Sequence, residues 1–110
     1  MWIFLNNAFL SIVANRHDDS QYLVRARVQG DLERVFGDHI QVIVTEDSDY
    51  RYRAFLDRET VTTIIGNHLQ NIDYDNFKNS IAPGDKYRSR HYASVWHVMR
   101  AWQQQEHPGA

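Results

Sequence analysis

The chain has 110 residues, of which 43% are hydrophobic and 13% aromatic, and its formal charge is −2, from 12 Lys and Arg against 14 Asp and Glu. This length and composition suit one domain that buries a core without a metal or disulfide, so we expect a single domain over residues 1–110. The small negative charge excludes a general basic field that attracts nucleic acid of any sequence. The chain has no cysteine, which excludes disulfides, thiolate catalysis and cysteine-based zinc sites within it.

The first elements in chain order are two apolar runs, residues 2–5 and 9–13, separated by Asn6, Asn7 and Ala8. Asparagine tolerates positive φ, so this spacing predicts a tight β-hairpin. The first run is short, is interrupted by Asn6 and has no basic residue before it. We therefore expect neither a signal peptide nor a membrane span, no membrane partner, and a cytoplasmic location.

A strand over residues 21–28 is expected next, and Asp31 is the predicted N-cap of a short helix over residues 32–36 that Gly37 ends. A strand over about residues 39–45 follows. An acidic turn at residues 46–49 then leads into a strand over residues 50–56.

Two longer helices complete the chain. Asp57 is the expected N-cap of the first, whose apolar stripe recurs every three or four residues at Val61, Ile64, Ile65, Leu69 and Ile72. Asp85 is the expected N-cap of the last, whose stripe is Tyr92, Val95, Trp96, Met99 and Trp102. We expect this second stripe to belong to the core or to cover the sheet. The alternative is an interface, with dimerisation as the natural way to bury it.

This order of elements predicts an α+β fold, an antiparallel sheet with helices. Residues 21–72 supply five of the six elements of a ferredoxin-like domain, and residues 9–13 can supply the missing strand. The expected fold is therefore ferredoxin-like and circularly permuted, with an extra C-terminal helix. The crossover through the first helix would have the usual right hand.

Four arginines stand out: Arg25 with Arg27, and Arg51 with Arg53. Side chains two apart in a strand share a face, and the predicted topology makes the two strands central antiparallel neighbours, so four guanidinium groups would converge on the face away from the helices. Guanidinium groups suit phosphate or carboxylate ligands. Apart from arginine we expect this face to offer mainly Phe55, which supports base stacking only weakly. The alternative is that the arginines lie beneath the last helix or pair with the chain's own carboxylates, among them Glu46, Asp47, Asp49, Asp57, Asp73 and Asp75.

The segment from Asp73 to Lys78 is the second candidate. Asp73, Asp75 and Lys78 are expected to assist the arginines in binding. In an extended segment the two aspartates would point the same way and could hold a cation or act as acid and base, although capping a turn and meeting arginines is the preferred interpretation. His91 and His97 are six residues apart, which is not a metal-ligand spacing on a helix. We expect no metal, no cofactor and no catalytic residue.

Several segments are similar to those of known proteins. They are residues 9–13 (FLSIV), 24–28 (VRARV), 49–54 (DYRYRA) and 72–80 (IDYDNFKNS), together with Tyr92, Val95, Trp96 and Met99. In these segments the chain resembles a family of short, uncharacterised bacterial or bacteriophage proteins. The family has no assigned reaction, cofactor or partner, so the resemblance implies a bacterial or phage origin and a single domain, and it assigns no functional residue.

These observations favour a non-catalytic binding or regulatory module that acts through an arginine-bearing sheet surface. The expected partner is an acidic protein surface or a second copy of the chain. The first alternative is binding of nucleic-acid or nucleotide phosphates by the same arginines, and the second is a small hydrolase or transferase that uses Asp73, Asp75 and a nearby histidine.

Overall fold

The computed structural model describes residues 1–109. Its contacts divide the chain into two compact units, residues 1–73 and the residues from Tyr74 onward, which we call unit 1 and unit 2. Each is described by itself, and the expectation of one domain over residues 1–110 stays a prediction. A search for membrane-spanning helices among the described residues finds none of sufficient length and apolarity.

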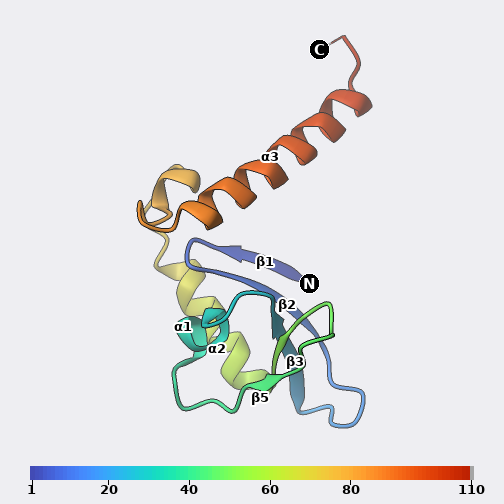
Figure 1. Ribbon diagram of the computed structural model, residues 1–110, viewed down its shortest axis with the longest axis vertical. Helices are drawn as coiled ribbons and strands as arrows, with labels where there is room; N and C mark the ends of the chain where they lie inside the picture. The colour runs from blue at the N-terminus through green and yellow to red at the C-terminus, as the bar shows by residue number, and fades with distance from the viewer. Residues whose placement is uncertain (110) are drawn as a thin grey trace. The chain divides into compact units, whose positions relative to one another are not determined.

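Unit 1 is a five-stranded antiparallel sheet with two helices, so the predicted α+β class is confirmed (Figure 1). The strands follow the order β1-β2-β3-β5-β4 across the sheet. In chain order the elements are β1 (Trp2–Leu5), β2 (Ala8–Ala14), β3 (Gln21–Ala26), α1 (Asp31–Phe36), β4 (Ile43–Val44), β5 (Tyr52–Asp57) and α2 (Arg58–Gln70).

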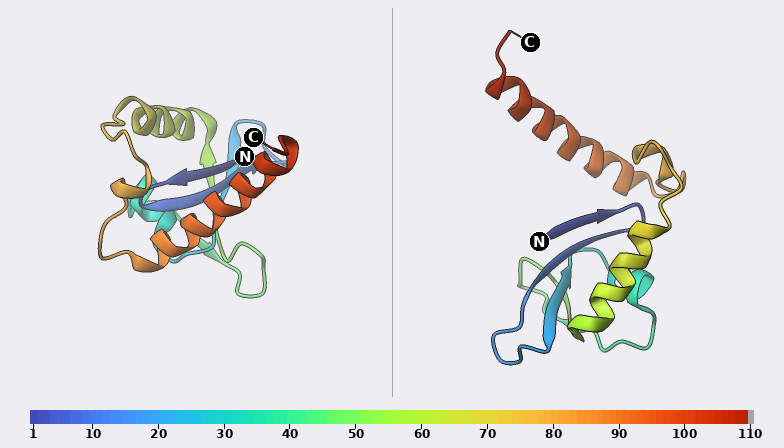
Figure 2. Two further views of the ribbon diagram at one scale, coloured as in Figure 1. Left: turned by 90° about the horizontal axis from the view of Figure 1, so that it is seen from above. Right: turned by 180° about the vertical axis from the view of Figure 1, so that it is seen from behind.

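The hydrophobic core lies between the sheet and its two helices, which pack side by side (Figures 1 and 2). Alternate residues of each strand face this core because side chains alternate between the faces of a sheet. Leu10, Val24 and Ala54 come from three adjacent strands and are 0% exposed, and Leu32 of α1 and Val61 of α2 pack against them. Within unit 1, the opposite face of the sheet is therefore the face that α1 and α2 do not cover.

Three strand predictions were too long. β3 ends at Ala26 and β5 begins at Tyr52, so Arg27 and Arg51 lie just outside the regular strands. The strand expected over residues 39–45 is reduced to Ile43–Val44, which pair only with Arg53 and Tyr52. Ile40 and Val42 produce the apolar pattern of that segment because they pack against the core from irregular backbone.

The predicted N-cap of α1 was wrong, because the helix begins at Asp31 and its N-cap is Gly30. The side chain of Asp31 is 0% exposed, accepts a hydrogen bond from the backbone N–H of Phe9 (3.0 Å) and forms an ion pair with Arg34. Asp31 thus fastens the start of β2 to α1. Gly37 ends the helix as predicted, with φ at 96°.

The predicted hairpin forms, with Leu5 paired to Ala8 across the two-residue turn Asn6-Asn7. The reason given for it was wrong, because no non-glycine residue among residues 1–109 has positive φ. The turn is held by tertiary structure instead, since Arg34 Nε donates a hydrogen bond to the carbonyl oxygen of Asn7 (3.0 Å).

In α2, Asp57 occupies the predicted N-cap position, but its side chain makes no capping hydrogen bond. The predicted apolar stripe is buried only in part: Val61 is 3% exposed, whereas Leu69 is 69% and Ile72 47% exposed. Ile72 lies beyond the end of the helix at Gln70, so helical periodicity does not apply to it, whereas Leu69 is exposed within the last turn.

Unit 2 contains the 3-10 helix η1 (Lys78–Ser80) and the 21-residue helix α3 (Lys86–Glu106). Asp85 caps α3 as predicted, since its side chain accepts a hydrogen bond from the backbone N–H of Arg88. The rings of Phe77 and Tyr92 stack with their centroids 5.9 Å apart, and this contact ties the η1 segment to α3.

Candidate binding surface

The two central strands of the sheet place two arginines side by side. Arg25 of β3 and Arg53 of β5 are direct cross-strand partners, so their side chains leave the sheet on the same face. Ser11 pairs with Arg25 on the other side, and Ile43 pairs with Arg53. This face, opposite α1 and α2, is called the arginine face below.

The ring of Tyr50 contacts both Arg25 of β3 and Arg27, which follows the end of that strand. The guanidinium carbons of Arg25 and Arg27 lie 4.4 Å and 4.2 Å from its centroid, both in the range of cation–π contacts. Tyr50 is only 4% exposed. Arg25 also donates a hydrogen bond to the hydroxyl of Ser11 (2.8 Å), while its buried Nε has no hydrogen-bond partner among residues 1–109. The ring of Tyr50 and the hydroxyl of Ser11 therefore both stabilise the charge of Arg25.

Arg53 makes several contacts with the segment between β4 and β5. Arg53 donates hydrogen bonds to the hydroxyl of Ser48 (2.5 Å) and to the carbonyl oxygen of Tyr50 (3.3 Å), and it lies 3.7 Å from the carboxylate of Asp49. Arg27 donates to the carbonyl oxygen of Asp49 (3.1 Å). Residues 46–50, called the acidic loop below, are thus fixed by arginines of both central strands.

Arg51 differs from the other three arginines. It is exposed, and within the described residues its side chain makes no hydrogen bond or ion pair. Its backbone carbonyl accepts a hydrogen bond from Thr45, which holds the residue at the start of β5. Its guanidinium group is therefore available to a ligand without displacement of an internal contact.

The sequence analysis missed the aromatic residues of the arginine face. Trp2, Phe4 and Phe9 lie on it because Trp2 pairs with Ser11 and Phe4 pairs with Phe9 across the hairpin. The rings of Phe4 and Phe9 stack at 4.6 Å, and Trp2 meets Phe9 edge to face at 6.2 Å. Trp2 is 66% exposed and Phe55, on the same face, 45%. The two-residue turn was the signal that could have placed them, since it fixes the register of β1 and β2.

The residues of the second candidate segment are divided between the units. Asp73 is exposed at the end of unit 1, and Asp75 and Lys78 are exposed in unit 2. The ammonium group of Lys78 lies 4.8 Å from the ring centroid of Trp96 on α3, so its partner within unit 2 is that helix. Over residues 1–109, no three His, Asp or Glu side chains gather as a metal site would require.

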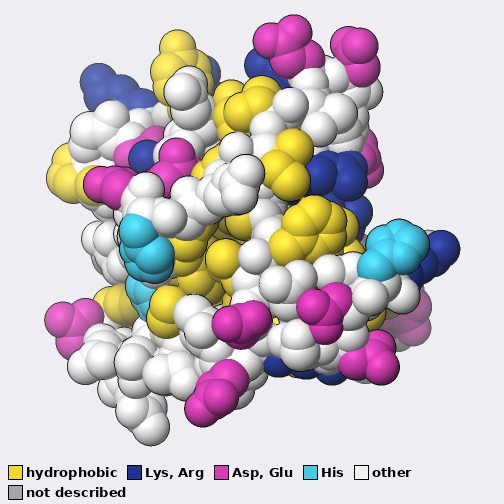
Figure 3. All heavy atoms as spheres, turned by 90° about the horizontal axis from the view of Figure 1, so that it is seen from below, with side chains coloured by type: hydrophobic (Ala, Val, Ile, Leu, Met, Phe, Trp, Pro, Cys, Tyr) yellow, Lys and Arg dark blue, Asp and Glu magenta, His cyan; other side chains and the backbone are white. Residues whose placement is uncertain are grey.

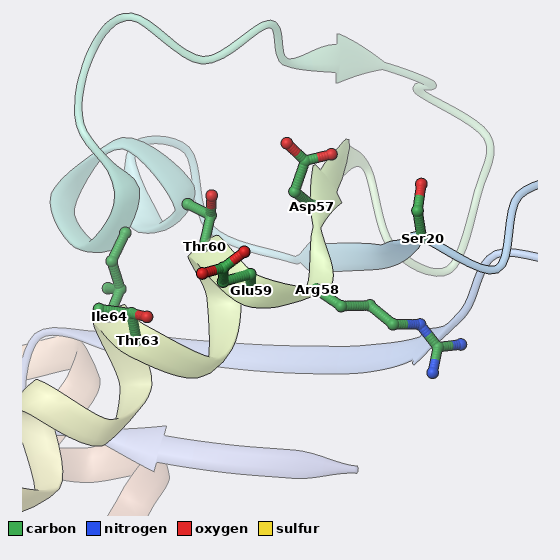
Figure 4. A pocket seen from close by; sticks show the side chains of 7 residues that line it. All are labelled: Ser20, Asp57, Arg58, Glu59, Thr60, Thr63 and Ile64. Atoms are coloured by element: carbon green, nitrogen blue, oxygen red, sulfur yellow. The ribbon is translucent and has the colours of Figure 1, made fainter.

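A hollow of about 660 Å³ lies at the start of α2, away from the arginine pairs, lined by Ser20, Asp57, Arg58, Glu59, Thr60, Thr63 and Ile64 (Figure 4). Arg58 points away from the other side chains, and its guanidinium group lies 4.6 Å from the ring of Tyr22. Asp57 and Glu59 at a helix N-terminus stabilise the helix dipole. Among residues 1–109, no histidine lines the hollow.

The two units have opposite formal charges. Residues 1–73 contain seven arginines against eleven carboxylates, a charge of −4, whereas residues 74–110 contain five basic residues against three carboxylates, a charge of +2. Figure 3 shows acidic side chains distributed among the hydrophobic and basic ones over the face in view. The arginine face is thus a local basic feature of a unit that is acidic as a whole.

Comparisons with known proteins give no match: no family model, no curated protein and no solved structure is similar to this chain. The resemblance to short bacterial proteins therefore stays a prediction.

Proposed function

We propose that this chain is a non-catalytic binding module that recognises an acidic protein surface through the arginine face. The observation that carries the proposal is the direct cross-strand pairing of Arg25 and Arg53 at the centre of the sheet. Arg51 is exposed and directly precedes the strand that carries Arg53.

The composition of the arginine face supports a protein partner. Arginine and aromatic residues are enriched at the centres of protein interfaces, and this face offers Trp2 and Phe55 exposed beside its arginines.

The acidic loop supports an acidic partner in particular. Asp49 and Ser48 already occupy part of the hydrogen-bonding capacity of the Arg53 guanidinium group. These internal contacts are of the kind that a carboxylate of a partner protein would make.

We also propose that unit 1 is a circularly permuted ferredoxin-like domain. The strand order β2-β3-β5-β4 supports it, because β2 takes the place of the last strand of the βαββαβ motif. Strand β1 is then an addition at the edge. In this fold the arginine face corresponds to the sheet surface opposite the helices.

The test uses a short peptide of alternating Glu and Phe and the same peptide with Lys in place of Glu. Binding to the full chain is followed by the NMR signals of the arginine side chains. We expect the Glu peptide to shift the signal of Arg51 and the Lys peptide to shift none. Arg51→Glu should weaken binding by about tenfold, since it replaces an attraction by a repulsion.

Arg16→Glu is the matched control, because Arg16 is exposed in the turn between β2 and β3 and the substitution changes the net charge equally. It should leave binding within about twofold of the unmodified chain. Equal losses from Arg16→Glu and Arg51→Glu would reduce the effect to overall charge and overturn the proposal, as would the absence of Glu-peptide binding.

Nucleic-acid binding is the second candidate function, and one observation favours it. The aromatic residues Trp2, Phe4, Phe9 and Phe55 share the face of Arg25 and Arg53, and exposed rings beside guanidinium groups are typical of surfaces that bind single strands. The charge of −4 of unit 1 opposes it.

A single-stranded oligouridylate decides between the two candidates. Nucleic-acid binding predicts an affinity that falls steeply with salt and is lost in the double variant Arg27→Ala, Arg53→Ala, whereas Trp2→Ala should remove the stacking contribution. Binding that none of these substitutions changes would exclude the arginine face as the site.

A further inference from the structure

The C-terminal half of α3 exposes most of its large apolar side chains. Val95 is 39%, Trp96 46%, Met99 50% and Trp102 56% exposed, although spacings of three and four residues place them on one side of the helix. The stripe formed by these four residues is called the α3 stripe. Unit 2 by itself leaves these four side chains exposed, and the expectation that the stripe belongs to a core or covers the sheet stays a prediction.

The helix has little internal support over this stretch. Within unit 2, the ring contact of Phe77 with Tyr92 and the contact of Lys78 with Trp96 support the first half and the middle of α3. Most helical stability in proteins comes from packing of an apolar face, and unit 2 by itself leaves much of this face unpacked. The α3 stripe therefore has the character of a surface that a partner covers.

The rim of the stripe is positively charged. Lys78 and Arg100 lie 4.8 Å and 5.8 Å from the ring centroid of Trp96. The helix carries four basic residues and only one acidic residue, Glu106. A partner that covers the stripe would therefore gain by bringing carboxylates to Lys78 and Arg100.

The apolar residues indicate the shape of this partner. Val95 and Met99 accompany the two tryptophans on the stripe, and apolar side chains of this kind fill the grooves between packed helices. A second α3 is disfavoured because the two helices would carry charge of the same sign. From the stripe and its rim we infer that α3 binds an acidic amphipathic helix of another protein, in the manner of helix pairs with complementary flanking charges.

The test measures binding of the full chain to a designed 21-residue helical peptide with Leu at its core positions and Glu at the flanking positions. A peptide with Lys at the flanking positions is the control ligand. We expect the Glu peptide to quench or shift tryptophan fluorescence and to bind at least about tenfold more tightly than the Lys peptide. Trp102→Ala should weaken binding by about tenfold because it removes a large part of the contact.

Charge variants separate this surface from general attraction. Arg100→Glu should reverse the preference, so that the Lys peptide binds more tightly than the Glu peptide. Arg90→Glu is the matched control, because Arg90 is nine residues from Met99 and lies roughly 180° around the helix from it. Arg90→Glu should keep the preference for the Glu peptide.

Three results would overturn the inference: equal binding of both peptides, equal effects of the Arg100 and Arg90 variants, or a stable dimer in light scattering that Trp102→Ala converts to a monomer. The last result would assign the stripe to a second copy of the chain. Arg51→Glu should leave binding of the helical peptide unchanged, so failure here and failure of the arginine face remain distinguishable.

Discussion

The guanidinium group of Arg25 lies over the buried ring of Tyr50, 4.4 Å from its centroid, on the face of the sheet that α1 and α2 leave uncovered. Arg27 lies over the same ring at 4.2 Å. Two cations on one ring would repel each other in a dry environment, but here each also has a hydrogen-bond acceptor, Ser11 for Arg25 and the carbonyl of Asp49 for Arg27. The acidic loop is therefore part of the stable structure of unit 1.

The first prediction concerns Tyr50. Tyr50→Leu keeps an apolar side chain but removes the ring, so both cation–π contacts are lost, and we expect the free energy of unfolding to fall by about 1–3 kcal/mol in urea denaturation. Tyr50→Phe keeps the ring and should change it by less than about 0.5 kcal/mol. Equal losses in the two variants would show that the hydroxyl, and not the ring, is important.

The second prediction concerns Asp31. Asp31→Ala leaves the backbone N–H of Phe9 without its buried acceptor and Arg34 without its ion-pair partner, and we expect a loss of about 2–4 kcal/mol of unfolding free energy. Asp31→Asn keeps an acceptor and should lose less. Asp38→Ala, at an exposed position just after α1, is the control and should lie within about 0.5 kcal/mol of the unmodified protein.

The third prediction compares two glycines. Gly66 lies inside α2, where an added Cβ would meet nothing within 4 Å, so Gly66→Ala should raise the free energy of unfolding by about 0.5–1 kcal/mol. Gly30 has φ of +90°, and an added Cβ would lie 2.7 Å from an Arg34 nitrogen, so Gly30→Ala should lower it by about 1 kcal/mol or more. Thermal denaturation of both variants gives the comparison, and the same sign for both would contradict it.

The fourth prediction concerns pH. Hydrogen bonds from the hydroxyl and the backbone N–H of Ser20 lower the pKa of Asp18 below its usual 3.8. The folded protein therefore favours the carboxylate form of Asp18, which adds to the free energy of unfolding. This added stability is complete above the pKa that Asp18 has in the unfolded chain, and it is lost as the pH falls through the lower pKa that Asp18 has in the folded protein. NMR titration of Asp18 should give a pKa below 3.8.

Asp18→Ala provides the check on that sign. The variant should be less stable than the unmodified protein at neutral pH, and the difference should disappear in strong acid, where Asp18 is protonated in both states. A difference that grows as the pH falls would contradict the assignment.

Sequence reasoning predicted the class of the fold and the pairing that matters most. The predicted topology made the strands over residues 22–28 and 50–56 central neighbours, and alternation placed Arg25 and Arg53 on the face away from the helices. Their cross-strand pairing agrees with this arrangement. Period-two patterns fix which residues share a face, so this part of the fold is readable from sequence. Arg27 and Arg51 lie outside the strands, next to the acidic loop. Alternation contains no information about the conformation of that loop, so it could not predict where the two strands end.

Other residues were misread because tertiary contacts override local preference. Asp31 has the side chain of a good N-cap, but that side chain is buried and contacts Phe9 and Arg34 instead. Phe9 is distant in the sequence, and Arg34 lies on the next turn of the helix. Ile40 and Val42 look like strand residues but pack on the core from irregular backbone. For the stripe that contains Trp96 and Trp102, the sequence left both a core and an interface open, because an apolar helical stripe has the same pattern in either case.

The contact of Asp49 with Arg53 has a consequence for selectivity. A carboxylate tethered in the same chain acts at an effective concentration on the order of millimolar, so a dilute small anion competes poorly with it. A ligand that supplies several carboxylates, together with apolar groups for Trp2 and Phe55, can displace the tethered carboxylate, because its contacts form as one multivalent event. The acidic loop would thus act as an internal competitor that disfavours dilute single anions relative to an extended acidic surface.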